Sequence, residues 1–589
     1  MNRHGYFAVQ HHQSVPLSPR LLAAIDHMQL GCRMMLAHQD ASQILLTQFA
    51  TPRLCFPNGR GLIIGHLFER ATSARIVEPG GNMDGPVESF VQRHWGGYVA
   101  LRSTRDGAEA WRDPSGAMPC YYLGIDGAQI YTSAPAILFG LGLLAADIDW
   151  EMLGQGLIYR DIKPTRTLLR RVEELLPGAA RSIHASETHT RCIWSPWRFI
   201  DTCPDPTFCD AVAAVGEAVT SSVAAWARCF ERPMLEISGG LDSAIVAAIA
   251  SKHASSTAIT FAPIAGDPDE TPYAAAIAQA IGVDLTIVAP AIGEIDVARS
   301  NAAGLPRPYA RCFSQDFDRS ALGHAKRTNA DAIFSGGGGD NVFCYLQSLS
   351  PLIDRFHAGG SKSGLIDTIN DLADLGNTNV WSIALRTLRR LMRGSKAPWY
   401  IDTRLLHTDW VQTASLPDEH PWVQVPDKAP PGKVAHVAAL IAFQNHLEGH
   451  GRSAWAPIVS PLLAQPIMET CLAVPSWLWC SGGNNRAVAR AAFKDLLPTP
   501  VLARRSKGAF DSLAAQLLEA NRPRVTELLM DGSLAAEGIV DRDAVLRAIG
   551  TADPSLTVRL WQLVDTEAWA RSWQPMELWA KPPSLQPNA

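Results

Sequence analysis

Segments typical of strands and helices alternate between residues 211 and 334, and this rhythm limits the fold more than any other feature of the chain. Apolar helical stretches such as SAIVAAIASKH separate the strand-like runs MLEI, TAITFA, DLTIVA and DAIF. Strands joined by helical crossovers form a parallel sheet with helices on both faces. We therefore expect a doubly wound α/β domain in this part of the chain.

The chain before this region has a different pattern. Residues 61–177 contain short strand-like segments separated by turns, which predicts an α+β unit with antiparallel sheets. Residues 194–206 carry three prolines and are predicted to be a linker. After Ser348 the chain reads as mainly helical. We expect two domains, residues 1–195 and 205–589, the second of which ends in a helical part.

The bulk composition is that of a globular protein, because 47% of the 589 residues are hydrophobic and 19% are charged. A net charge of -5 gives no global attraction to nucleic acid or to an anionic membrane, so neither is expected as a partner. The N-terminal residues lack the apolar core of a signal peptide. The 11 cysteines are scattered without a CxxC pair. These features predict a cytoplasmic protein with reduced thiols.

A strand, a glycine turn and a helix follow one another in the run MLEISGGLDSAIV. The turn residues Ser238, Gly239 and Gly240 point backbone N–H groups at one spot near the positive end of the helix dipole. Pyrophosphate fits such a spot, and Ser243 adds a hydroxyl donor. Asp242 would repel phosphate without a cation, so it predicts Mg²⁺ there. The alternative is that this aspartate only caps the helix.

Four consecutive glycines follow the last strand-like run, in the segment SGGGGDN. Glycine loses much conformational freedom on folding, so such a run inside a domain needs a physical reason. The two alternatives are a flexible hinge and a surface built for close approach.

The SGGLDS run resembles the pyrophosphate-binding loop of the asparagine synthetase-like, ATP-pyrophosphatase superfamily, and SGGGGDN resembles the second loop of that superfamily. These enzymes split ATP to AMP and pyrophosphate by adenylating a carboxylate. The resemblance implies that Ile237 and Pro263 flank the adenine. It also implies that Asp242 and Asp340 are the Mg²⁺ ligands and take part in catalysis.

In the second loop the resemblance implies that Ser335, Gly336 and Gly337 approach the nucleotide. Two positions depart from the superfamily pattern. Gly337 stands in place of the usual glutamate, and Asn341 stands in place of the last acid. The loss of both acids opens space and removes charge, which argues against asparagine synthesis.

A basic segment, RAVARAAFKDLLPTPVLARRSKG, lies late in the chain. Its RRSKG run resembles the superfamily segment whose lysine sits over the adenylate, which implies a catalytic Lys507 that stabilises negative charge in the transition state. Arg504 or Arg505 is expected to bind pyrophosphate, and the choice between them stays open. Arg486 and Lys494 are expected on a solvated basic helix face.

The segments GGGGDNVFCYLQS, SPLLAQP and GGNNRAVAR together resemble the cyclases that close lasso peptides, with Ala464 in place of an aspartate found in asparagine synthetases. Such cyclases activate an Asp or Glu side chain of a precursor peptide, and the N-terminal amine of that peptide then closes a macrolactam ring. The resemblance implies a precursor peptide as partner. A leader-binding protein and a leader protease are further candidate partners.

The runs WGGYVAL and RDPSGAMPCYY resemble the Ntn-type glutamine amidohydrolase domain of asparagine synthetases. The nucleophile of that domain is a cysteine next to Met1, whereas this sequence has Asn2 there and its first cysteine is Cys32. We therefore expect an inactive amidotransferase-like domain. Arg112 and Asp113 are expected to form a structural ion pair.

Two smaller signals favour structural roles. His446 and His450 have a spacing that can ligate zinc, but no third ligand stands out. The acids of residues 267–270 lie beside the nucleotide-side strand ends, where Thr271 is expected to cap a helix with Pro272 in its first turn.

The sequence thus favours an ATP- and Mg²⁺-dependent macrolactam synthetase. Two alternatives stay open. One is a small-molecule ligase, either an asparagine synthetase or a β-lactam-forming relative. The other is a non-catalytic homologue that only binds a peptide.

Overall fold

A computed structural model describes residues 4–574, with the exception of residues 81–82, 106, 185–186, 201–205, 265, 360, 394–398, 505–510 and 552. The predicted roles of Arg505 and Lys507 therefore fall outside the described residues.

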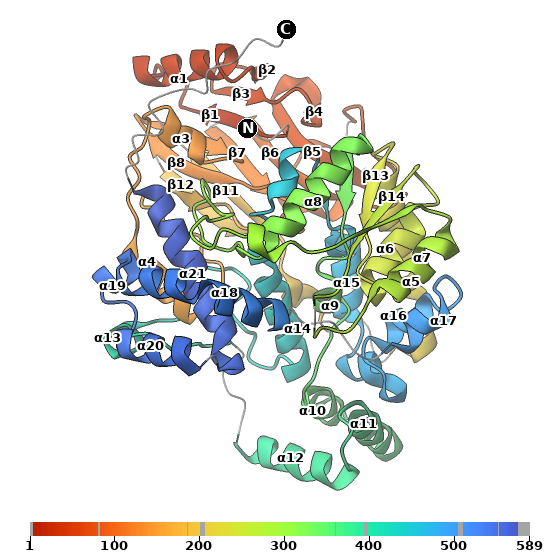
Figure 1. The fold of residues 1–589 in the computed structure, drawn as a ribbon. Coiled ribbons are helices and arrows are strands. Elements are labelled where there is room, and N and C mark those ends of the chain that lie inside the picture. The colour runs from red at the N-terminus through yellow and green to blue at the C-terminus, as the bar shows by residue number, and fades with distance from the viewer. Residues whose placement is uncertain are drawn as a thin grey trace.

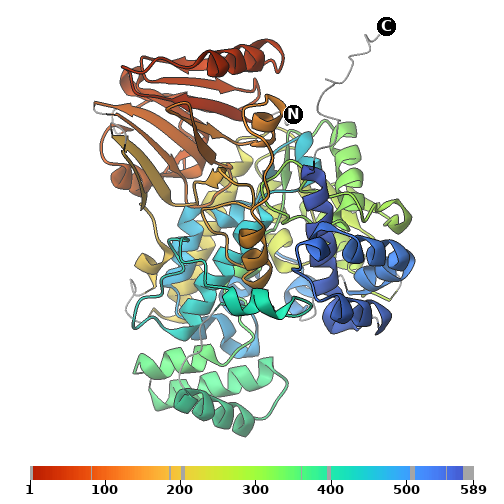
Figure 2. The same cartoon turned by 90° about the vertical axis from the view of Figure 1, so that its left-hand side faces the viewer.

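Two six-stranded antiparallel sheets form the first part of the chain (Figures 1 and 2). In spatial order the first sheet consists of β10 (Glu173–Glu174), β8 (Tyr121–Ile125), β9 (Ala128–Thr132), β1 (Tyr6–Gln10), β3 (Gln43–Thr47) and β2 (Met35–Gln39). The second sheet consists of β12 (Glu187–Cys192), β11 (Ala179–His184), β7 (Gly107–Arg112), β6 (His94–Thr104), β5 (Gly61–Glu69) and β4 (Arg53–Cys55). The predicted antiparallel sheets are confirmed, and the two sheets pack face to face as a sandwich.

Alternate side chains of these strands fill the space between the sheets. Tyr6 and Ala8 of β1 share one buried cluster with Leu62 and Ile64 of β5, and the residues between them point to the outer faces. Helices cover those outer faces, which explains why the strands are apolar on both sides. The helices of this part are α1 (Pro19–Leu30), α2 (Val87–Arg93), α3 (Ala136–Gly140) and α4 (Trp150–Ile158).

The second part of the chain contains the predicted parallel sheet. In spatial order its strands are β15 (Leu285–Val288), β14 (Thr257–Phe261), β13 (Pro233–Glu236), β16 (Ala332–Phe334) and β17 (Ile458–Val459), and all neighbours are parallel. One face of the sheet is covered by α5 (Phe208–Ala227), α6 (Leu241–Ala250) and α7 (Thr271–Ile281), and the other by α8 (Ser314–Arg327). The doubly wound architecture is confirmed.

The connectivity of this sheet places both glycine loops together. The chain runs from β13 outward to β14 and β15 and then returns to β16, which lies on the other side of β13. Ligands of open α/β sheets bind at such a reversal, at the carboxyl ends of the strands. The loops that follow β13 and β16 are therefore neighbours at the edge where a nucleotide site is expected.

Among the described residues, α5 is the one helix whose length and apolar composition would allow it to cross a membrane. Its residues Val215, Val219 and Val223 are buried in the core beside α6, which accounts for that composition.

The remainder of the chain is mainly helical, as expected. Its helices are α9 (Gly339–Val342), α10 (Ser350–His357), α11 (Lys362–Leu375), α12 (Val380–Arg393), α13 (Thr408–Thr413), α14 (Pro431–Phe443), α15 (Gln465–Ala473), α16 (Ala487–Ala492), α17 (Thr499–Ala503), α18 (Asp511–Met530), α19 (Ser533–Ala536), α20 (Arg542–Thr551) and α21 (Pro554–Trp573). Helices α10, α11 and α12 form an extension at one end of the molecule (Figures 1 and 2).

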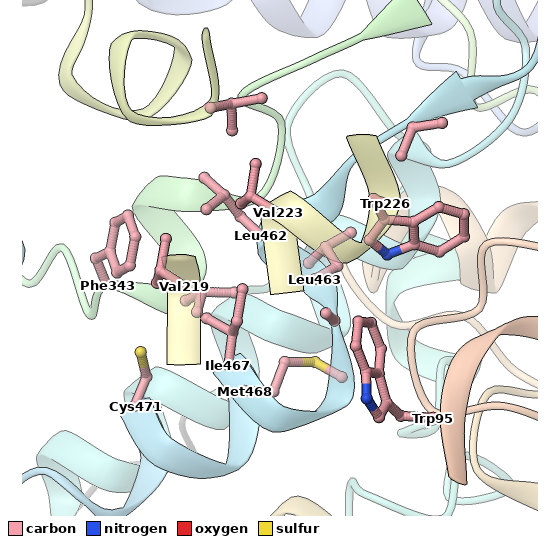
Figure 3. Packing of buried hydrophobic residues seen from close by; sticks show 14 of the residues in the cluster. Trp95, Val219, Val223, Trp226, Phe343, Leu462, Leu463, Ile467, Met468 and Cys471 are labelled. Atoms are coloured by element: carbon pink, nitrogen blue, oxygen red, sulfur yellow. The ribbon is translucent and has the colours of Figure 1, made fainter. Parts of the chain in front are cut away.

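The two parts of the chain share their hydrophobic cores. Trp95 of β6 belongs to the same buried cluster as Trp226 of α5 and Met468 of α15 (Figure 3). A second cluster joins Phe7 of β1 to Trp561 of α21. Because each core draws on both parts, the sandwich and the parallel-sheet part depend on each other for burial.

A buried ion cluster also joins the two parts, and it corrects the expected pairing of Arg112 with Asp113. Arg112 Nη1 and Lys163 Nζ each lie 2.8 Å from Glu174 Oε1, and Arg307 Nε lies 3.3 Å from Glu174 Oε2. Asp113 instead accepts hydrogen bonds from the backbone N–H groups of Tyr98 and Ser115. Sequence adjacency favoured the wrong pair because neighbouring residues point to opposite sides of a strand.

Replacing Glu174 with glutamine should lower the free energy of unfolding by about 3–5 kcal/mol, because three buried cations lose their common carboxylate. Burial alone would raise the pKa of Glu174, but the neighbouring cations lower it to about 2. Since this folded pKa lies below the unfolded value, the contribution is fully present above about pH 4.3 and is lost as the pH falls toward 2.

Urea unfolding of Glu174→Gln at a series of pH values tests this expectation. The matched control is Glu527→Gln, which removes one partner of an exposed ion pair with Arg524 and should cost less than about 1 kcal/mol. The assigned role would be contradicted if both substitutions lowered the free energy of unfolding equally. It would also be contradicted if the difference in unfolding free energy between wild type and Glu174→Gln stayed the same from pH 7 to pH 3.

Candidate active site

A cavity of about 640 Å³ opens at the carboxyl ends of β13, β14 and β16, a volume usual for small-molecule sites. Most residues predicted from the sequence come together on its wall. They are Ile237, Ser238, Gly240, Asp242, Ser243, Pro263, Ser335, Gly336, Gly337, Asp340 and Arg504. Among the described residues of the predicted set, Gly239 does not line the cavity. It has a φ of +71° and packs against the start of α7.

The first glycine loop is closed by its own serines. Ser243 Oγ accepts from the backbone N–H of Ser238 at 3.2 Å and donates to the carbonyl of Gly240 at 3.2 Å. The hydroxyls of Ser238 and Ser243 are 3.1 Å apart. Gly240 is the N-cap of α6, so Asp242 lies inside the first turn and is not the capping residue. The capping alternative for this aspartate is wrong, and its carboxylate faces the cavity.

The second glycine loop lies directly on the first, and this contact explains two of its four glycines. A Cβ added to Gly336 would lie 2.5 Å from the backbone nitrogen of Ser243. A Cβ added to Gly339 would lie 2.5 Å from the Cβ of Asp242. Close approach is therefore the reason for the run, but the surface approached is the first loop of the protein itself. The hinge alternative is wrong.

Asp242 and Asp340 converge on a single cation, the guanidinium of Arg486. Arg486 Nη1 lies 3.0 and 2.9 Å from the two carboxylate oxygens of Asp242 and 2.6 Å from Asp340 Oδ1. The Arg486 side chain is only 11% exposed, so the expectation of a solvated basic face is wrong for this residue, although Lys494 is exposed. Two carboxylates that share one positive charge fit the donor set of Mg²⁺, which prefers carboxylate, water and phosphate oxygens.

The helix predicted around Arg486 begins one residue later than this arginine. Arg486 has a φ of +52° and precedes α16, so its side chain turns toward the carboxylates and not along the helix face. Arg490 holds this turn by donating to the carbonyls of Asn485 and Leu502. Both arginines belong to the run GGNNRAVAR. Only the backbone geometry shows that Arg486 contacts the two aspartates, whereas Arg490 holds the turn.

Arg504 reaches the site from the end of α17. It forms an ion pair with Glu270 and donates to the carbonyl of Gly239 at 3.1 Å, and its guanidinium lies 4.8 Å from the centre of the Tyr273 ring. This arginine therefore links the first glycine loop to the start of α7. Glu270, and not Thr271, is the N-cap of α7, and the carboxylate of Asp269 accepts from the Thr271 backbone N–H at the first residue of the helix.

A neutral wall forms the side of the cavity where the departures from the superfamily pattern lie. A Cβ at Gly337 would lie 3.1 Å from the Phe443 ring and 3.3 Å from Ser460 Oγ, so the expectation that this glycine opens space is wrong, because Phe443 and Ser460 fill it. Asn341 Nδ2 donates to the carbonyl of Ala439 at 2.7 Å, a bond that a carboxylate cannot make. Ala464 lies on a smaller neighbouring cavity and does not line this one.

The histidines at 446 and 450 do not form a metal site in the described residues. His450 Nε2 hydrogen-bonds to the carbonyl of His446, and the part of the chain that the structure describes contains no group of three metal-ligating side chains. Arg452, which sequence reasoning did not single out, lies on the cavity wall and pairs with Glu236 and Asp318.

Replacing Gly339 with alanine should displace Asp242 and weaken Mg·ATP binding by at least about tenfold, because small misplacements of site groups are costly. Isothermal titration with Mg·ATP measures the effect. Gly293→Ala is the matched control, since a Cβ at Gly293 meets open space. Unchanged affinity in a folded Gly339→Ala protein would show that the contact between the loops does not position the site.

Comparison with known proteins identifies the family of the second part. No curated protein matches the chain. Solved structures of the allosteric regulatory enzyme of purine biosynthesis and of glutamine phosphoribosylpyrophosphate amidotransferase from B. subtilis match at 11% and 12% identity. Each match covers 48% of this chain and slightly less than two thirds of the other, 64% and 65%, and TM-scores of 0.21 and 0.22 carry no argument about the fold. The asparagine synthase family profile matches residues 214–571, so the chain belongs to the asparagine synthase family, a family of ATP-dependent carbon–nitrogen ligases.

Proposed function

We propose that the protein is an ATP-dependent macrolactam synthetase that joins an Asp or Glu side chain of a lasso precursor peptide to the N-terminal amine of that peptide. The observation that carries the ligase chemistry is the convergence of Asp242 and Asp340 on one cation between the two glycine loops. The neutral wall at Gly337 and Asn341 favours a peptide carboxylate over free aspartate and ammonia, because neither position offers an acid to bind a small amine.

The reaction proceeds in two steps. An oxygen of the peptide carboxylate attacks the α-phosphorus of ATP, pyrophosphate leaves, and an acyl-adenylate forms. The N-terminal amine then attacks the acyl carbon, loses a proton to solvent, and AMP leaves as the amide bond forms. Holding amine and acyl-adenylate together is worth roughly 7–11 kcal/mol of barrier, so the chain need mainly activate the acid and keep water away.

The residues of the cavity have different roles in this reaction. Asp242 and Asp340 would hold Mg²⁺, which when bound neutralises phosphate charge. The backbone N–H groups at the start of α6, which follow the N-cap Gly240, would donate to pyrophosphate. Arg504, held over the first loop, is the described candidate for a pyrophosphate contact. Lys507 stays a prediction for the transition-state contact, and Arg505 stays the alternative to Arg504.

The sandwich part supports this role without glutamine chemistry of its own. Cys120 is buried between the sheets, and burial raises the pKa of its thiol to about 11, which makes it unsuitable as a nucleophile. We propose that this part is a non-hydrolysing relative of Ntn-type amidotransferase domains that supports the peptide site. The expected setting is the cytoplasm, with a leader protease and a leader-binding protein as partners.

Asp242→Asn and Asp340→Asn should each lower AMP formation from ATP by at least about a hundredfold, because a neutral amide is a much poorer ligand than a carboxylate for the Mg²⁺ that would neutralise the phosphates. Chromatographic measurement of AMP checks this. The control is Asp269→Asn, which lies beside the site but does not line the cavity and should retain activity. Normal turnover in both site variants would remove the metal assignment.

The substrate class is tested with the precursor peptide, any required leader protease, ATP and Mg²⁺. The expected product is a peptide lighter by one water, formed in step with AMP, with fragmentation mapping the new bond to the N-terminal amine and one internal acid. Replacing that acid with alanine should stop AMP formation as well, since activation comes first. If free aspartate with ammonia released AMP and the peptide did not, the small-molecule ligase would be the correct assignment.

A further inference from the structure

Helix α12 lies at the outer edge of the molecule, attached by one face only. Its N-terminus is capped by Asn379, whose Oδ1 accepts from the Ser382 backbone N–H at 2.8 Å. Ile383 is 4% exposed and packs in a small cluster with Leu352 and Leu372 of α10 and α11. Figures 1 and 2 both show the helix at the end of the α10–α12 extension. Among the described residues, no part of that extension covers the opposite face of α12.

An apolar stripe runs along this outer surface. Trp381, Leu385, Leu388 and Met392 are 81%, 49%, 54% and 71% exposed. Their spacing of four, three and four residues places them in one line on a helix. Water-soluble proteins seldom leave a contiguous apolar stripe of this kind uncovered, and where they do it marks an interaction site.

Arginines flank the stripe. At 3.6 residues per turn, Arg389 falls directly beside the stripe, and Arg386 falls between Arg389 and the covered face that contains Ile383. Both arginines are exposed. The 14 residues of α12 contain no Asp or Glu, although Asp and Glu outnumber Lys and Arg by 57 to 52 in the whole chain. The positive charge is therefore local to this helix and does not follow from the composition of the protein.

We propose that α12 binds the surface of an anionic membrane. The four apolar side chains enter the boundary between headgroups and acyl chains, and the arginines contact lipid phosphates. A convex helix with apolar and basic residues side by side suits a deformable lipid surface better than a protein groove, and exposed Trp is typical of that interface. From the negative net charge of the whole chain we expected no membrane partner. A helix that lies in the plane of a membrane surface, however, binds through the residues of its own exposed face. This proposal is independent of the ligase reaction.

Co-sedimentation of the full chain with vesicles tests the proposal. Wild type should pellet with vesicles of phosphatidylcholine and phosphatidylglycerol, and far less with phosphatidylcholine alone. Leu385→Gln/Leu388→Gln should weaken binding at least about tenfold through lost apolar contact. Arg386→Gln/Arg389→Gln should weaken it by about tenfold or more and reduce its salt dependence. The matched control is Leu546→Gln, which removes a 46% exposed leucine on α20 and should bind as wild type does.

Circular dichroism and thermal melting establish that each variant is folded, since all of the replaced side chains are exposed. Absence of wild-type binding to the anionic vesicles would overturn the proposal, as would equal binding of wild type and both double variants. If light scattering showed a wild-type dimer that Leu385→Gln/Leu388→Gln converts to a monomer, with no vesicle binding, a second copy of the chain would be the occupant and the membrane assignment would be wrong.

Discussion

The contact between the two glycine loops is the constraint on which the candidate active site depends. Gly336 and Gly339 let the second loop lie on Ser243 and Asp242 without a side chain between them. The parallel pairing of β13 with β16 brings the loops to the same edge, and the missing side chains let them touch. Only with this contact do Asp242 and Asp340 come close enough to share one cation.

The charges around the cavity are arranged as compensated groups. Arg486 is matched by two aspartates, Arg504 by Glu270, and Arg452 by Glu236 and Asp318. Although burial by itself lowers the pKa of Arg452, its two carboxylate partners raise it above the ordinary value. Partly buried charges are tolerated when such partners are present. The site is thus ordered before a nucleotide binds, which reduces the reorganisation that binding requires.

The segment SPLLAQP of the second part connects the candidate site to the sandwich part. Ser460 lies beside Gly337, which lines the cavity, whereas Gln465 and Glu469 of α15 accept or donate hydrogen bonds with Val91 and Trp194 of the first part. One short stretch therefore links the cavity wall to the sandwich. The buried Glu174 cluster adds a second connection, so the first part has a structural reason to be retained even without glutamine hydrolysis.

Strand–helix alternation and glycine turns are local properties of the chain, so they predicted the class of both parts and the positions of the two glycine loops. Eleven of the predicted site residues line one cavity for that reason. The partners of the charged residues, by contrast, follow only from the fold. Arg486 was expected on a solvated face but contacts two aspartates more than 140 residues away in the sequence. Arg112 was expected to pair with its neighbour Asp113 but pairs with Glu174. The outward apolar stripe of α12 also required the fold, since periodicity does not tell which face of a helix is covered. The partners of a charged side chain and the covered face of a helix depend on distances in three dimensions, and a local stretch of sequence does not specify these distances.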